Sequence, residues 1–82
     1  MEKRIGTITI LIKERQQSAV INQILSEHSD IILCRQGLPF HDSRVAVISL
    51  IVEGTVDRIN ALTGQLGRLS QVECKAVVTK NN

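Results

Sequence analysis

The first half of the chain shows a strand-type spacing of apolar residues and then a helix-type spacing. Residues 5–12 alternate, with Ile8, Ile10 and Ile12 on one side of the chain, which predicts a β-strand. Beyond a charged turn, apolar residues recur at the 3.6-residue spacing of a helix, which predicts a helix from about Arg15 to Ser29. Residues 31–36 predict a second strand that stops at Gly37. The order up to this point is strand, helix, strand.

The second half repeats this order. Residues 44–53 are apolar on both faces, which indicates a central strand. Gly54 is expected to end it, and Thr55 to cap a helix that runs to about Arg68. Alternation over residues 72–78 predicts the last strand.

These elements predict an α+β fold, the ferredoxin-like βαββαβ sandwich. Right-handed crossovers place both helices on one face of a four-stranded antiparallel sheet with strand order 4-1-3-2. With 82 residues, we expect a single domain spanning 1–82.

The predicted sheet has one face that neither helix covers, and exposed apolar patches of this kind mark interfaces. The second strand also lies at the edge of the predicted sheet and contains a run of apolar residues. An exposed edge of this kind either pairs with another chain or risks aggregation. The residues expected at the interface are Leu11, Ile31, Leu33, Val45, Val47, Ile51 and Val77. We predict a homo-dimer or tetramer; the alternative is that loops or the C-terminal tail cover these surfaces.

Composition argues against nucleic-acid-binding and membrane-spanning proteins. Ten Lys and Arg against eight Asp and Glu give a net charge of +2, and Phe40 is the single aromatic residue, so direct nucleic-acid binding is not indicated. The longest apolar stretch, residues 45–52, is too short for a membrane span, and the N-terminus lacks a signal-peptide pattern. Cys34 and Cys74 are expected on opposite sheet edges, about 14 Å apart, too far to bridge. We therefore expect a cytoplasmic protein.

Catalysis and metal binding find little support in the residue spacing. A metal site would use His28, Cys34 and His41, with Cys74 as a further ligand, but no pair has a metal-ligand spacing, so the site would form between subunits. Alternatively, His28 ends the first helix. His41 stands next to an aspartate and near a serine, but sequence neighbours do not make a catalytic triad. We predict a protein that is not an enzyme.

Two short segments are candidate ligand sites. Arg35, Gln36 and Gly37 offer a forked cation, an amide and an open backbone, which suit an anion or carboxylate; the alternative is a solvated strand end. Thr63 and Gly64 lie within the second helix, where glycine costs about 1 kcal/mol relative to alanine. Close packing is the simplest reason for this glycine, and approach of a ligand or partner is the alternative.

Two motifs carry a family resemblance. Residues 30–39, DIILCRQGLP, and residues 62–69, LTGQLGRL, make the chain resemble the small iron-only hydrogenase system regulators over essentially its whole length. The resemblance implies an ACT-like ferredoxin fold, similar to the ligand-sensing domain of nickel-responsive repressors, and a regulatory role linked to hydrogenase maturation.

The sequence lacks ligand-site features of two related classes of protein, the amino-acid-binding ACT domains and the nickel-responsive repressors. The turn at 14–17 lacks the glycine common in amino-acid-binding ACT domains, and no H-x-H pair or DNA-binding segment of the nickel-responsive type is present. We therefore expect a non-enzymatic, oligomeric regulatory domain that holds a small ligand of unknown identity at a subunit interface and acts through a protein partner. The alternatives are an intersubunit metal sensor and a scaffold without a small ligand.

Overall fold

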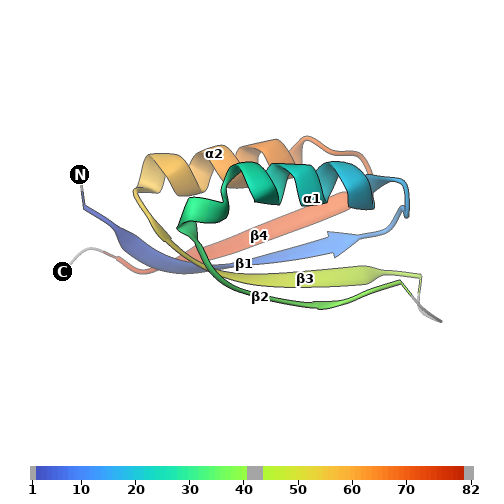
Figure 1. The fold of residues 1–82 in the computed structure, drawn as a ribbon, viewed down its shortest axis with the longest axis horizontal. Coiled ribbons are helices and arrows are strands. Elements are labelled where there is room, and N and C mark those ends of the chain that lie inside the picture. The colour runs from blue at the N-terminus through green and yellow to red at the C-terminus, as the bar shows by residue number, and fades with distance from the viewer. Residues whose placement is uncertain (1, 41–43, 81–82) are drawn as a thin grey trace.

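The computed structural model describes residues 2–40 and 44–80 and shows a sheet with two helices on one face (Figure 1). The elements, in chain order, are β1 (Arg4–Ile12), α1 (Gln17–Glu27), the 3-10 turn η1 (Ser29–Ile31), β2 (Ile32–Leu38), β3 (Ala46–Gly54), α2 (Val56–Gly67) and β4 (Val72–Val78). The four strands are antiparallel in the order β2-β3-β1-β4, which is the predicted 4-1-3-2 order counted from the other edge. The ferredoxin-like fold is confirmed.

The element boundaries lie within two residues of the predicted ones; α1, predicted from about Arg15 to Ser29, runs from Gln17 to Glu27. The hydroxyl oxygen of Thr55 accepts a hydrogen bond from the backbone N–H of Arg58 at 3.2 Å, so the predicted cap of α2 is confirmed. His28 is the C-terminal cap residue of α1, as predicted for a histidine that ends the first helix. The predicted second strand was wrong at both ends, because Ser29–Ile31 form η1 and because Gly37 and Leu38 continue the pairing with β3.

The core lies between the helices and the sheet face formed by the even-numbered residues of β1. Its members are Ile8, Ile10, Ile12, Ile21, Leu25, Ile31, Ala46, Leu50, Val52, Ile59, Leu62, Leu66 and Val72. The expectation that Ile31 lies at an exposed edge is therefore wrong: η1 places its side chain in the core, 4% exposed. Gly54 makes room for it, since a Cβ there would lie 3.0 Å from Cγ2 of Ile31.

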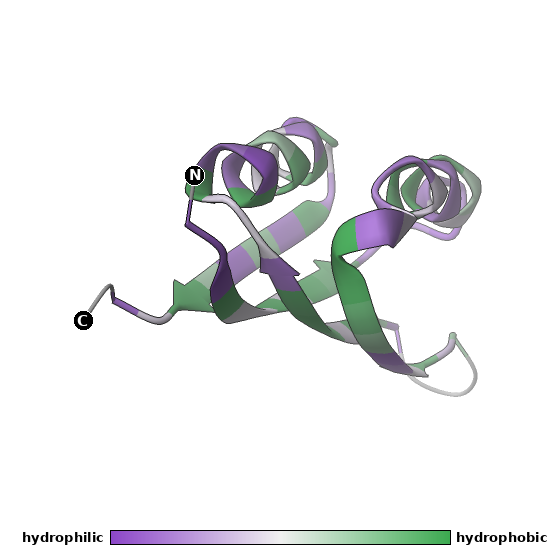
Figure 2. Ribbon diagram, turned by 60° about the vertical axis from the view of Figure 1, so that its left-hand side comes forward, coloured by the Kyte–Doolittle hydropathy of each residue, from purple (hydrophilic) through white to green (hydrophobic). Residues whose placement is uncertain are grey.

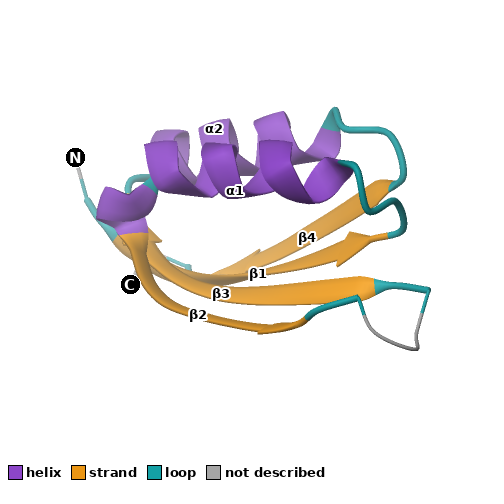
Figure 3. Cartoon of the chain, turned by 45° about the vertical axis from the view of Figure 1, so that its right-hand side comes forward, coloured by secondary structure: helices purple, strands orange, loops and turns teal. Residues whose placement is uncertain are grey.

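The opposite face of the sheet has no helix over it (Figure 3). Strand register places Leu11 beside Val47, and Thr7 between Ile51 and Val77, on this open face. Val45 lies directly before β3 and is half-buried. Of the expected interface residues, Leu33, Ile51 and Val77 are among the exposed large apolar side chains, at 59%, 40% and 74% exposure.

A β-bulge in β2 decides which of its side chains face the helices. Ile32 lies opposite Val52, and Cys34 lies opposite Ile51, the residue adjacent to Val52 in β3. Two steps along β2 thus match one step along β3, so Leu33 is an extra residue without a partner in β3. Because successive side chains alternate in side, this insertion reverses the facing of every later residue in β2. Cys34 therefore joins the open face, while Arg35, opposite the buried Leu50, faces the helices.

The two cysteines are free and lie on the two edge strands, as predicted. Cys74 is opposite the buried Ile10 and thus on the helix side, whereas Cys34 is on the open face. Within residues 2–40 and 44–80, no helix is long and apolar enough to cross a membrane.

Candidate functional site

An open cleft of about 720 Å³ lies between α1 and β2, on the helix side of the sheet. Figure 2 shows α1 and α2 side by side above the sheet, and Figure 3 shows β2 as the outermost strand on the α1 side. The lining comes from the end of β1, the turn before α1, the N-terminal half of α1, the C-terminal half of β2 with the loop after it, and the start of β3. The lining residues are Ile12, Arg15, Ser18, Asn22, Arg35, Gly37, Leu38, Pro39, Phe40, Ala46, Val47 and Ile48.

The cleft exists because β2 presents little apolar volume to α1. After the bulge, the residues of β2 that face the helices are Arg35 and Gly37. One is a long polar side chain that reaches toward solvent, and the other has no side chain at all. A Cβ on Gly37 would lie 3.0 Å from the carbonyl oxygen of Val47, so glycine also lets β2 lie close against β3 at this point.

Arg35 is held across the cleft by α1. Its Nη2 donates a hydrogen bond of 2.6 Å to Oδ1 of Asn22. Both side chains line the cleft, and both residues are exposed. A guanidinium has five N–H donors, so this single bond orients the group and leaves donors free for a ligand.

Arg15 forms the second cationic group of the cleft. Its Cζ lies 5.0 Å from the centre of the Phe40 ring, within the range of a cation–π interaction. Phe40 is half-buried and packs against the core, so the ring gives Arg15 a fixed support.

The charge of the lining is one-sided. Among the described residues around the cleft, Arg15 and Arg35 are cationic and none is acidic. The floor is apolar, with Ile12 and Ala46 buried and Ile48 packed against the core. Such a surface can bind an anion through the guanidiniums and an apolar group on the floor.

The structure brings together only part of the predicted ligand site. Arg35 and Gly37 line the cleft, whereas Gln36 is opposite Ser49 on the open face. Thr63 and Gly64 lie on α2, outside the cleft lining. A Cβ on Gly64 would have no atom within 4 Å, apart from its own helix backbone and chain neighbours, so close packing within this chain does not explain that glycine.

Sequence reasoning missed the α1 side of the cleft. Arg15, in the turn before α1, and Ser18 and Asn22, on α1, were not singled out. The spacing of four residues between Ser18 and Asn22 places them on one face of a helix. Phe40 was named only as the single aromatic residue. The helical spacing of these polar residues was a readable signal, but the wall opposite them depends on the bulge in β2.

The candidate metal ligands do not form a cluster within the chain. Nε2 of His28 lies 3.1 Å from Oε1 of Gln65, to which it donates, and its Nδ1 is buried without a hydrogen-bond partner. Cys34 is exposed on the open face, and His41 lies outside the described residues. Burial raises the pKa of the Cys74 thiol, which favours the protonated form over the metal-binding thiolate. In the described part of the chain, no three His, Cys, Asp or Glu side chains are grouped to hold a metal ion.

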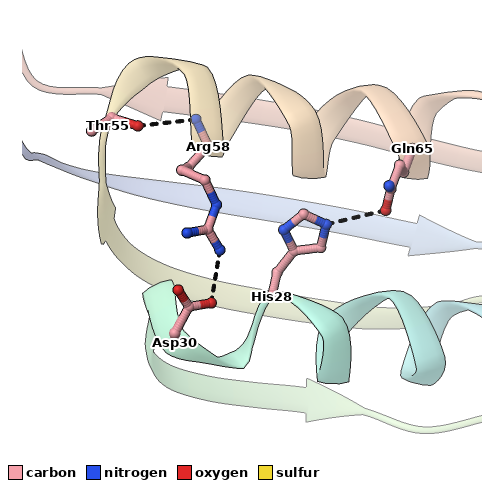
Figure 4. A network of polar contacts seen from close by, with 5 residues as sticks. All are labelled: His28, Asp30, Thr55, Arg58 and Gln65. Carbon is pink, nitrogen blue, oxygen red and sulfur yellow. Dashed lines mark hydrogen bonds and ion pairs between the residues drawn. The ribbon is translucent and has the colours of Figure 1, made fainter. Parts of the chain in front are cut away.

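Polar contacts join the end of α1 and η1 to α2 (Figure 4). Nη2 of Arg58 donates to Oδ1 of Asp30 at 2.7 Å, and this hydrogen bond holds the pKa of the Asp30 carboxyl below its usual value. The His28–Gln65 contact lies further along the same helix. Both contacts lie outside the cleft, and they fasten the two helical segments to each other.

A sequence model of the TM1266-like family, described as a proposed iron-only hydrogenase system regulator, matches residues 4–76. The chain belongs to the TM1266-like family. The solved structure of the uncharacterized protein TM1266 from Thermotoga maritima is 36% identical, with a TM-score of 0.88; the match covers 96% of this chain and 100% of that one. The resemblance seen in the two sequence motifs is confirmed.

More distant structures share only the fold with this TM1266-like chain. The C-terminal domain of the MgtC protein from Mycobacterium tuberculosis is 6% identical, with a TM-score of 0.71 over 93% of this chain and 87% of that one. The divalent ion tolerance protein CutA1 from Ehrlichia chaffeensis is 15% identical, with a TM-score of 0.50 over 100% and 87%. No curated protein matches the chain.

Proposed function

We propose that this TM1266-like chain is a non-enzymatic regulatory domain of an iron-only hydrogenase system, acting in the cytoplasm as a homo-oligomer that senses a small molecule. The α1–β2 cleft is the observation that carries the proposal, because it combines an apolar floor with convergent polar groups, as ligand sites do. The family description supports the regulatory role.

The open sheet face supports self-association. Ile51 and Val77 lie on either side of Thr7 on this face, and both are exposed. A second copy would remove this apolar surface from water, which is the main favourable term in association. A domain of 82 residues also gains the burial that its own small core does not supply.

The same face supports a second candidate function, a scaffold that binds a maturation protein and holds no small molecule. An apolar sheet face suits a protein partner as well as a second copy. The two candidates differ at the cleft, which the scaffold would leave without a ligand. The metal-sensor alternative gains no support from the positions of His28 and Cys34.

Native mass spectrometry of the untagged protein tests both parts of the proposal, because one spectrum reports the subunit number and any bound mass. The expected result is a dimer or tetramer, and Ile51→Lys should shift it to monomer. Ala61→Lys, which adds the same charge at an exposed position of α2, is the matched control and should leave the oligomer intact. A monomeric wild-type protein would contradict the proposed oligomer.

A thermal-shift screen tests the sensing function separately. A ligand present at about 100 times its dissociation constant stabilises the folded state by about 2.7 kcal/mol, which a melt detects. A stabilising metabolite supports the sensor, and a wide screen without any shift supports the scaffold instead.

A further inference from the structure

We infer that the α1–β2 cleft binds a small organic carboxylate with an aliphatic body and discriminates against α-amino acids. This inference rests on the proposed sensing function and names the chemical class of its ligand.

The anionic end of the ligand would bind Arg35. This guanidinium lies on the cleft wall, and its contact with Asn22 keeps it pointing across the cleft toward α1. A planar fork of N–H donors matches the two oxygens of a carboxylate, and charge-assisted hydrogen bonds of this kind are the stronger ones in proteins. Asn22 is a positioning residue in this arrangement.

Arg15 supplies a second positive charge on the α1 side of the cleft. Its guanidinium lies against the Phe40 ring, which restrains the side chain and leaves its N–H edge available. The first turn of α1 contains no acidic residue, so nothing in that turn cancels the positive end of the helix dipole. Both walls of the cleft therefore favour an anion.

The apolar floor of the cleft favours a ligand with an apolar part over an inorganic ion. Ile12 and Ala46, which are paired across β1 and β3, and Ile48 on the same strand as Ala46 are apolar lining residues of the cleft. At about 720 Å³ the cleft has the size of a small-molecule site rather than of a single oxyanion. An aliphatic body on this floor would add roughly 0.8 kcal/mol for each methylene that it buries.

The one-sided charge discriminates against amino acids. The ammonium of an α-amino acid would stand beside the carboxylate and therefore close to Arg35. The described residues of the lining include no carboxylate that could pair with it. Like-charge repulsion would then cancel part of the attraction that the carboxylate gains.

Four probes test these points by NMR titration of the ¹⁵N-labelled full chain: 4-methylpentanoate, its neutral amide, leucine and inorganic phosphate. The first three share one branched carbon skeleton, so they differ only in the charged groups. The observed signals are the backbone amide of Gly37 and the side-chain amide of Asn22, which report on the two walls. We expect 4-methylpentanoate to bind about tenfold more tightly than each of the other probes.

Variants assign the effect to Arg35. Arg35→Gln should weaken 4-methylpentanoate about tenfold and leave the neutral amide unchanged, while Arg35→Lys should restore part of the loss. Asn22→Ala should weaken the acid by a smaller factor, also without effect on the amide. Arg68→Gln removes one positive charge from an exposed position outside the cleft and should change nothing.

Several results would overturn the inference. Equal affinity for the acid and its amide would refute the role of charge, and equal affinity for leucine would refute the discrimination against amino acids. Equal affinity for phosphate would refute the need for an aliphatic body, and unchanged cleft signals with every probe would refute the site.

These results can be distinguished from failure of the proposed function. A neutral molecule that binds the cleft more tightly than 4-methylpentanoate, read from the Gly37 and Asn22 signals, would preserve sensing and refute only the carboxylate. A monomeric protein with an empty thermal-shift screen would refute the proposed function itself, whatever the titration shows.

Discussion

The two βαβ halves of the molecule have the same connectivity but different interiors. In β3–α2–β4, the last strand presents four apolar side chains to the helix layer: Val72, Cys74, Ala76 and Val78. Ala76 is exposed, and the other three are buried or half-buried. In β1–α1–β2, the last strand presents Ile32 before the bulge but Arg35 and Gly37 after it, and a cleft remains between α1 and β2. In each half, the strand side chains that face the helix decide whether the space between helix and sheet is filled by core or remains open as a cleft.

The difference between the halves arises from one inserted residue. Leu33 forms the bulge that turns Arg35 toward α1 and Cys34 toward the open face. With regular pairing the facing would be reversed, and β2 would present Cys34 to α1 much as β4 presents Cys74 to α2. Natural bulges near sites re-aim side chains in this way.

The largest expected effect comes from matched leucine truncations in the two halves. Leu66 of α2 is fully buried, so Leu66→Ala should lower the free energy of unfolding by about 2–5 kcal/mol. Leu38 on the cleft rim is 57% exposed, and Leu38→Ala should cost less than about 1 kcal/mol. Urea denaturation at one protein concentration measures both. Similar losses would show that the open half carries as much stability as the closed half.

The next largest effect on stability is expected at the contact between the two halves, where His28 meets Gln65. His28 is buried at the end of α1 and reaches Gln65 of α2, so His28→Ala removes packed volume and a contact between the helices. We expect a loss of about 1–3 kcal/mol in the same denaturation experiment. Gln65→Ala removes only the exposed partner and should cost less, and the reverse order would contradict the buried position of His28.

Matched glycine substitutions should have opposite signs in the two halves. Gly37→Ala pushes a Cβ to 3.0 Å from the Val47 carbonyl and should destabilise the protein by about 1 kcal/mol. Gly64→Ala meets no neighbouring atom within 4 Å and should stabilise α2 by about 0.5–1 kcal/mol. Thermal melts check the signs. A loss at Gly64 would instead show that the oligomer needs a bare backbone there.

The smallest effect is a pH dependence, because its groups are exposed. Arg58 lowers the pKa of Asp30, and Lys13 lowers the pKa of Glu73, so each carboxylate stabilises the folded state while it is ionised. This stabilisation is present at neutral pH and is lost in acid, as the pH falls through the lowered folded pKa. Asp30→Asn and Glu73→Gln should each slightly reduce the fall in the free energy of unfolding below neutral pH, which is the acid limb of a stability–pH curve. An unchanged limb would show that the ion pairs contribute nothing.

Local sequence signals predicted the elements of the fold. The strand and helix spacings, the cap at Thr55 and the helix-ending His28 follow from interactions within a few residues. Each was confirmed, except for the two ends of the second strand. The site was only partly predictable: Arg35 and Gly37 were named, but Gln36 was grouped with them, because side chains next to each other along a strand face opposite ways.

The sequence by itself determined which segments become strands and helices, their order, and hence the strand order of the sheet, since these follow from periodicity and crossover handedness. It also contained the motifs that place the chain in its family. Only the tertiary structure decided that Ile31 enters the core, that β2 carries a bulge, and that Arg15, Asn22 and Arg35 line one cleft. The physical reason is that register depends on pairing and burial between segments far apart in sequence, where a shift of one residue moves a side chain to the other face.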